Sequence, residues 1–139
     1  MGFTRYWKRV RPSEELAEAA QKIIDASEVT IKGGFGEGNP IITSEIIWLN
    51  GDRSIHMDHE TLLIDNEPDW RGKLHRGFCK TAEKPYDEVV AAILIAAAVI
   101  DDEVEVSRDG RFPLDDQNGI KLYEGVFGEI PDDVWERLR

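Results

Sequence analysis

Apolar residues recur at helical spacing in the stretch that follows Pro12. Those that would line one face of a helix are Leu16, Ala19, Ala20, Ile23 and Ile24. Ser13 can cap the start of this helix, and Glu14 and Glu15 suit the positive end of its dipole. The next position on the same face is the polar Ser27, so the pattern predicts an amphipathic helix that ends there.

A second helical segment is apolar on every side. Val89–Ile100 is an unbroken apolar run of 12 residues, and Pro85 ahead of it suits the first turn of a helix. Asp101 and Asp102 lie where the helix dipole disfavours acids, which predicts that the helix ends before them. Such a helix must be covered all round, so we expect the helix over residues 85–100 to be the central element of the fold.

The remaining apolar residues predict short strands and two further helices. Asn50-Gly51 predicts a two-residue hairpin, with a return strand over residues 53–57. The segments expected as strands are 29–32, 46–49, 53–57, 61–64, 77–80 and 104–107. A short helix should end at Gly128, and a last helix should begin after Pro131. The predicted class is α+β: a single domain over residues 1–139, with a largely antiparallel sheet packed against the central helix and flanking helices.

Composition limits the class of protein. A chain of 139 residues with 41% hydrophobic residues fits one domain with a real core. The lone cysteine, Cys79, permits no disulfide within the chain, which is typical of a reducing compartment. The longest apolar run is too short to cross a membrane, and the N-terminal MGFTRYWKRVRP has no apolar core of a secretory signal. We therefore expect a cytoplasmic protein, in the host cytoplasm if the gene is carried by a phage, without a membrane partner.

Charge is distributed unevenly along the chain. The net charge of −11 argues against duplex nucleic acid and anionic membranes as direct partners. Residues 1–11 nevertheless carry +4 and residues 71–88 carry +2, whereas residues 12–70 carry −10 and residues 89–139 carry −7. Two basic segments thus stand out in an acidic chain, and each is a candidate for binding an anion.

The start of the central helix is the first candidate site. Lys80, Thr81 and Lys84 precede it, and a helix N-terminus offers unpaired N–H groups and a partial positive charge to an anion. Arg5, from the other basic segment, can add a further cation. In the alternative interpretation, Thr81 caps a turn and the lysines are solvated.

The N-terminal segment supplies the second candidate. In Thr4-Arg5-Tyr6-Trp7-Lys8-Arg9, an aromatic face can stack on a base while cations hold phosphates. The alternative is a strand whose aromatic residues fill the core. Asp109, with Ser107, can hydrogen-bond a ligand, although Asp109-Gly110 is also a simple strand end. The predicted ligand-binding set is Arg5, Tyr6, Lys80, Thr81, Lys84 and Asp109.

Two other clusters predict no catalytic or metal site. His56-Met57-Asp58-His59-Glu60 contains metal-ligating side chains, but not in the His-Glu-x-x-His order of a zinc protease. On a strand, His56 and His59 would point to opposite faces. Cys79 has no adjacent base, which favours a buried structural thiol. We expect neither a metal nor a cofactor, and no catalytic residues are identified.

Several strings in the chain resemble those of one family. They are Gly2-Phe3-Thr4-Arg5-Tyr6-Trp7, Asn50-Gly51, Asp58-His59-Glu60-Thr61, residues 78–87 (FCKTAEKPYD), Val106-Ser107-Arg108-Asp109-Gly110, Leu122-Tyr123 and Phe127-Gly128. The family comprises small proteins of bacteria, prophages and phages that have a GFTxYW string and an FxKTAxKPYD string but no established catalytic residues. This chain has Arg108 where the family pattern has a second serine. The resemblance implies an accessory domain of mobile elements, and such proteins often inhibit host defences.

Three functions are compatible with these observations. The first is a non-enzymatic protein that binds a small anionic ligand such as a nucleotide, in a mobile-element setting to sequester a defence signal. The second is an acidic protein that inhibits a host nucleic-acid-binding enzyme by imitating phosphates. The third is a metal-dependent phosphoesterase that uses the cluster from His56 to Glu60. The absence of a paired nucleophile and base favours a protein that is not an enzyme. A homodimer is the default assembly.

Overall fold

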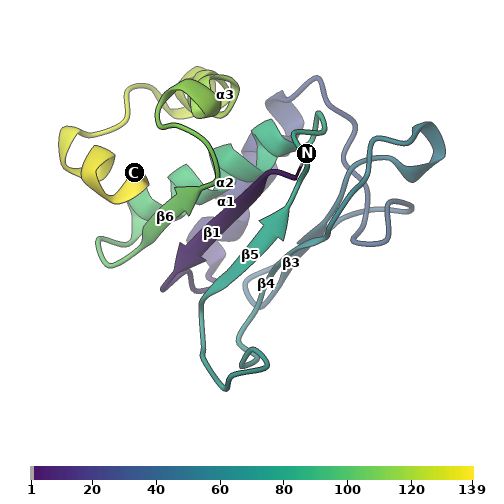
Figure 1. Ribbon diagram of the computed structural model, residues 1–139, viewed down its shortest axis with the longest axis horizontal. Helices are drawn as coiled ribbons and strands as arrows, with labels where there is room; N and C mark the ends of the chain where they lie inside the picture. The colour runs from purple at the N-terminus through teal and green to yellow at the C-terminus, as the bar shows by residue number, and fades with distance from the viewer. Residues whose placement is uncertain (1) are drawn as a thin grey trace.

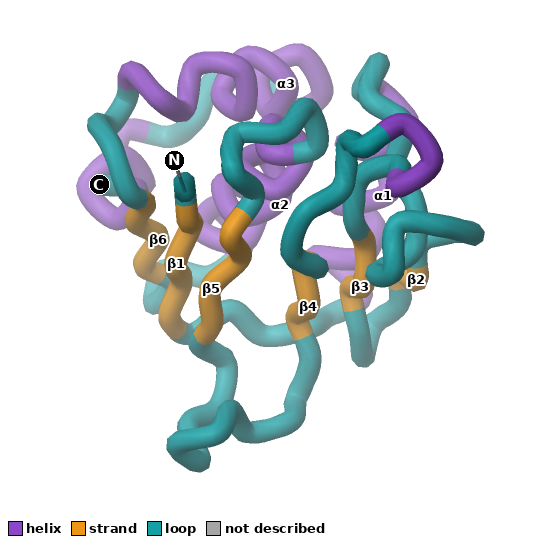
Figure 2. The backbone as a smooth tube through the Cα atoms, turned by 45° about the vertical axis from the view of Figure 1, so that its right-hand side comes forward, coloured by secondary structure: helices purple, strands orange, loops and turns teal. Residues whose placement is uncertain are grey.

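The computed structural model describes residues 2–139. Figure 1 shows one sheet in front of helices, and Figure 2 shows the strands side by side. In chain order the elements are β1 (Thr4–Lys8), α1 (Glu14–Ala26), β2 (Ile41–Ile42), β3 (Ile47–Leu49), η1 (Arg53–Ile55), β4 (Leu62–Ile64), β5 (Gly77–Lys80), α2 (Asp87–Ile100), β6 (Glu105–Arg108), η2 (Leu114–Asp116), α3 (Gln117–Phe127) and η3 (Asp132–Leu138), where η marks a 3-10 helix.

The strands form two antiparallel three-stranded sheets. In the first, the order is β5-β1-β6, and Tyr6 in the central strand lies between Phe78 and Ser107. In the second, the order is β2-β3-β4. The sheets adjoin at β4 and β5, where the Glu60 amide donates to the Lys80 carbonyl over 3.1 Å. The predicted α+β class with a largely antiparallel sheet is confirmed.

Alternation along β1 decides which side chains reach solvent. Arg5 and Trp7 are buried, whereas Tyr6 and Lys8 are exposed. This is the period of two expected for a strand with one face on the core. We call the solvent-facing side of β5-β1-β6 the outer face; α1 and α2 lie behind the opposite side (Figure 1).

The central helix is as predicted. Every residue from Val89 to Ala98 in α2 is buried, and α2 packs against both α1 and α3. The helix ends at Asp101. The guanidinium of Arg137 in η3 lies over this end, because its Nη1 donates to the carbonyls of Ala98, Asp101 and Val104 over 2.9–3.1 Å. A cation placed there complements the negative end of the dipole.

The predicted hairpin at Asn50-Gly51 is wrong. Residues 53–55 form the 3-10 helix η1, so no strand returns from the turn. Asn50 is buried, and its side-chain oxygen accepts from the amides of Gly51 and His59 while its Nδ2 donates to the carbonyls of Gly34 and His59. The Asn50 amide therefore holds two loops together, which outweighs the local preference for a tight turn.

Two other elements differ from the prediction in extent or type. The segment 29–32 contributes only the bridge between Lys32 and Asn50. The last helix does follow Pro131, but it is of 3-10 type over Asp132–Leu138. The elements that lie within a few residues of their predicted ranges are α1, α2, β3, β4, β5 and β6, and α3 ends before Gly128 as predicted. Strand β1 matches the alternative interpretation of the N-terminal segment, whereas β2 and η2 were not predicted.

The contact between α2 and α3 provides a test of the packing. A methyl group built on Gly119 would lie 2.5 Å from the Ala91 Cβ, whereas one built on Gly125 meets nothing within 4 Å. We expect Gly119→Ala to lower the free energy of unfolding by about 1–3 kcal/mol through overpacking. Gly125→Ala, in the same helix, should raise it by up to about 1 kcal/mol because alanine favours the helix. Urea unfolding measures both, and equal effects would contradict the close contact.

Candidate functional site

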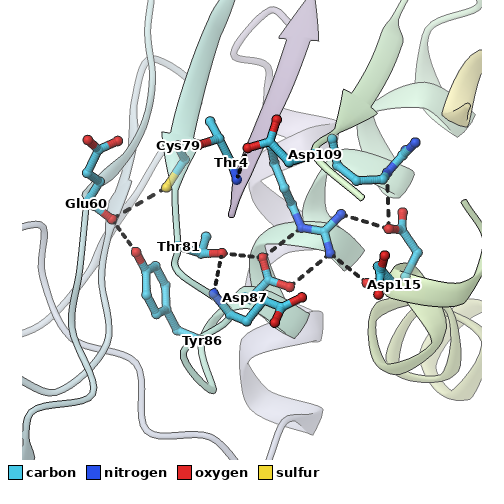
Figure 3. Close-up of polar contacts among 12 residues, drawn as sticks. Thr4, Glu60, Cys79, Thr81, Tyr86, Asp87, Asp109 and Asp115 are labelled. Atoms are coloured by element: carbon cyan, nitrogen blue, oxygen red, sulfur yellow. Dashed lines mark hydrogen bonds and ion pairs between the residues drawn. The ribbon is translucent and has the colours of Figure 1, made fainter. Parts of the chain in front are cut away.

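Arg5 is the centre of a buried polar network behind the sheet. Figure 3 shows Thr81, Asp87 and Asp115 of this network. Its side chain is 1% exposed. The Nε and Nη2 atoms donate to the two carboxylate oxygens of Asp87 over 2.8 and 2.9 Å, and Nη1 donates to Asp116 Oδ1 over 3.0 Å. Nη2 also donates to the Asp115 carbonyl over 3.2 Å. The guanidinium is thus engaged by protein groups on both of its edges.

The network joins segments that are distant in sequence. Arg5 comes from β1, Asp87 from the first turn of α2, and Asp116 from the end of η2. The buried Thr81 hydroxyl donates to Asp87 Oδ1 over 2.6 Å. The carboxylate at the start of α2 therefore belongs to the protein itself, and it takes the place that an anionic ligand was predicted to fill.

The charges of the network balance. Arg108 Nε lies 3.1 Å from Asp116 Oδ1, so two arginines face two aspartates. Burial opposes the charge on Arg5, but the bonds and ion pairs with Asp87 and Asp116 outweigh it and raise the pKa of Arg5. Burial lowers the pKa of Arg108, and the nearby Arg5 acts in the same direction. A balanced, buried set offers no surplus positive charge to a ligand.

The six predicted ligand-binding residues do not converge on one site. Arg5 and Thr81 meet at Asp87 on the inner side of the sheet. Tyr6 lies on the outer face, where its hydroxyl donates to Asp109 Oδ1 over 3.1 Å. Lys80 is exposed, and Lys84 Nζ donates to the His56 carbonyl over 3.1 Å. Arg5 and Thr81 are buried, whereas Tyr6 and Lys80 are exposed, so the six side chains do not gather at one place.

The two basic segments, in contrast, do meet. Strand β1 pairs with β5 from Thr4 opposite Lys80 to Trp7 opposite Gly77. Residues of segments 1–11 and 71–88 thus lie side by side, and the exposed Lys8 and Lys80 share the outer face. A local basic surface exists on a molecule whose net charge is −11.

Cys79 and Tyr86 form a second buried cluster behind β5, and neither side chain is activated as a nucleophile or base. The Tyr86 hydroxyl and the Cys79 thiol both donate to the Glu60 carbonyl, over 2.5 and 3.4 Å. Burial raises the pKa of Cys79 to about 12 and also raises the pKa of Tyr86. Both groups remain protonated at neutral pH, and the prediction of a buried thiol at Cys79 is confirmed.

The histidine cluster takes a different form from the expected strand. His56 follows η1 with a left-handed backbone, at φ 58°. Within residues 2–139, no three His, Cys, Asp or Glu side chains gather closely enough to hold a metal ion. In the same residues, no helix has both the length and the apolar character needed to span a bilayer.

A groove on the outer face contains residues that the sequence prediction missed. Its volume is about 550 Å³, and its lining residues are Tyr6, Trp7, Lys8, Asp69, Trp70, Arg71, Arg76, Gly77, Phe78, Glu105, Val106, Ser107, Glu136, Arg137 and Arg139. The loop between β4 and β5 supplies Trp70, and its side chain is 81% exposed. Phe78 and Tyr6 are 57% and 41% exposed. The available signal was Trp70, directly before the second basic segment, with Arg71 and Arg76 inside it.

The acidic residues of this groove have partners of their own. Asp69 accepts from the amides of Lys73 and Arg71 over 2.8 and 2.9 Å, and these bonds, together with the nearby charges of Arg76 and Arg71, lower its pKa. Glu105 pairs with Arg9 over 2.8 Å. Among residues 2–139, no carboxylate lies within 4.0 Å of the charged nitrogens of Lys8, Arg71 or Arg76, the lining cations that carry the argument below.

Comparison with family models, with curated proteins and with solved structures finds no match to this chain. The chemistry of the described residues must therefore carry any functional argument.

The buried network predicts a large loss of stability when one partner is removed. Asp87→Ala leaves Arg5 buried without its bidentate partner, so the free energy of unfolding should fall by about 3–5 kcal/mol. Asp87→Asn retains an acceptor oxygen, so its free energy of unfolding should lie between those of Asp87→Ala and the unaltered protein. Glu105→Ala is the control, because it breaks an exposed pair and should cost less than about 1 kcal/mol. Similar losses for Asp87→Ala and Glu105→Ala in chemical denaturation would contradict the assigned role.

The Cys79 thiol should lose its proton at a much higher pH in the folded protein than in the unfolded chain. Its folded pKa is about 12, whereas an unfolded thiol titrates near about 8.5. The unfolded chain therefore binds fewer protons above about 8.5, and the free energy of unfolding should fall as pH rises from there toward about 12. Cys79→Ala should lose this part of the pH dependence. A thiol reagent at pH 8 should label Cys79 rapidly in urea and slowly in buffer; rapid labelling in buffer would refute the burial.

Proposed function

We propose that the protein binds a small anionic ligand with an aromatic ring, a nucleotide, in the groove on the outer face, and that it does so without turnover. The observation that carries this proposal is that three exposed aromatic side chains lie beside cations whose charged nitrogens have no carboxylate oxygen within 4.0 Å among residues 2–139. The aromatic residues are Tyr6, Trp70 and Phe78, and the cations are Lys8, Arg71 and Arg76.

The aromatic side chains are placed to receive a base. Tyr6 and Phe78 are directly opposed on neighbouring antiparallel strands, so both exposed side chains project from adjacent points of the outer face. Trp70 stands on the adjoining loop, with the Arg71 guanidinium 4.4 Å from its ring centroid. Stacking of a base on an aromatic side chain contributes about 1–3 kcal/mol. Exposed rings that gain no core contacts are suited to such a role.

The cations supply the complement to phosphate. Arginine offers a planar set of N–H donors that matches phosphate oxygens, and both Arg71 and Arg76 are exposed at the groove. Lys8 adds a point charge on the outer face. Because the rest of the molecule is acidic, a compact anion that fits the groove is favoured over a large polyanion.

The lining residues favour binding over catalysis. They include neither histidine nor cysteine, and the Tyr6 hydroxyl is engaged by Asp109, which raises its pKa. A protein that holds a nucleotide without consuming it lowers the free concentration of that nucleotide. In the mobile-element setting that the resemblance implies, this would withdraw a nucleotide signal from host defence in the cytoplasm.

Calorimetry with ATP, GTP, CTP and UTP tests the proposal. We expect binding to at least one, with affinity that falls as salt is added. Phe78→Leu removes the ring but keeps an apolar side chain, and it should weaken binding by about 5- to 150-fold, the equivalent of about 1–3 kcal/mol. Arg76→Ala should also weaken binding, whereas Lys121→Ala on α3, away from the groove, should not. Absence of heat with every nucleotide would refute the proposal.

A further inference from the structure

We infer that the outer face accepts a short single-stranded polynucleotide, whose successive bases stack on Tyr6 and Phe78. This inference rests on the proposed function and names the ligand class more closely. The shared chemistry is a run of two or three unpaired bases on a phosphate backbone, from either RNA or DNA.

The register of β1 and β5 carries the first step. Tyr6 and Phe78 occupy directly opposed positions, and such side chains have Cβ atoms about 4.5–5.5 Å apart. Successive bases of one strand are separated by about 3.4 Å when fully stacked and by more when the strand is extended. Two neighbouring bases can therefore meet the two rings, whereas a single base leaves one ring in water.

The positions of Lys8 and Lys80 favour a ligand with more than one phosphate position. On the outer face, Lys8 follows Tyr6 by two residues and Lys80 follows Phe78 by two residues, and the strands are antiparallel. The two lysines therefore lie at opposite ends of the aromatic pair, about 13 Å apart along the strand direction. The phosphates of a mononucleotide all lie at one end of its base. A backbone with a phosphate on both sides of each internal nucleotide can reach both lysines.

The loop between β4 and β5 extends the same surface. Trp70 and its stacked Arg71 stand beside β5, and Arg76 precedes that strand. A third base and its phosphate can be received there. The aromatic and cationic positions thus continue from the sheet to the loop, as required for a strand longer than one nucleotide.

The rest of the molecule limits the length and form of the ligand. Residues 12–70 and 89–139 carry −10 and −7, so a strand that leaves the outer face meets an acidic body. A duplex keeps its bases stacked on one another and cannot offer them to side-chain rings. The ligand that fits is short and unpaired.

Fluorescence anisotropy, together with competition by unlabelled ligands, tests the inference. The series is a mononucleotide, a dinucleotide, a trinucleotide, a 12-mer and a duplex 12-mer, in RNA and DNA arms. We expect affinity to rise at least tenfold from mononucleotide to trinucleotide and then to level off, with the duplex weakest. A preference for RNA or for DNA identifies the source and supports the inference in either case.

Variants separate the contributions. Tyr6→Leu and Phe78→Leu should each bring trinucleotide affinity close to that of a mononucleotide. Lys80→Ala should weaken the trinucleotide and reduce its salt dependence while leaving mononucleotide binding unchanged. Lys121→Ala is the matched control on α3, and circular dichroism confirms that each variant is folded.

The two proposals fail in different ways. If mononucleotides bind as tightly as trinucleotides, the inference is overturned and the proposed function stands. If no member of the series binds, both are overturned. If light scattering shows a dimer that Phe78→Glu converts to a monomer, and no oligonucleotide binds, a second copy of the chain covers the outer face and the inference is overturned.

Discussion

The ion pairs of Arg5 with Asp87 and Asp116 are the constraint on which the rest of the structure depends. A guanidinium that is 1% exposed is tolerated only with its carboxylates in place, because an unpaired buried charge costs several kcal/mol. The two aspartates belong to α2 and to η2, just before α3. One side chain in the first strand therefore fixes how the sheet, the central helix and the C-terminal part of the chain lie relative to one another.

This constraint also determines the outer face. With Arg5 directed inward, the period of two along β1 directs Tyr6 and Lys8 outward. A slip of one residue would bury Tyr6 and expose Arg5, and would take the Arg5 guanidinium away from both aspartates. The network at the back of the sheet thus selects the aromatic and basic residues presented at its front. Stability and the proposed binding function use alternate positions of the same strand, so variants on the outer face can be made without loss of the buried pairs.

Pairing of β1 with β5 brings the two basic segments of the chain together in space. The basic segments are separated by an acidic stretch in sequence, yet the register places Thr4 opposite Lys80 and Tyr6 opposite Phe78. Mutual repulsion of the exposed lysines is limited because Lys8 and Lys80 lie at opposite ends of the pair. The fold therefore places the exposed Lys8 and Lys80 on one face of a protein whose net charge is −11.

By itself, the sequence determined the helices and most strands, because these depend on local periodicity: the stripe after Ser13, the apolar run of α2 and the stop at Asp101 are all readable from neighbouring residues. It also singled out Arg5 and Thr81, as candidate ligand-binding residues.

Only the tertiary structure decided that these two bind Asp87. It also decided that Asn50 bridges loops and makes no hairpin, and that Trp70 and Phe78 border a groove. The physical reason is that a charge or an amide takes whichever partner the fold brings within hydrogen-bond distance, and that partner can be more than a hundred residues away, as Asp116 is from Arg5.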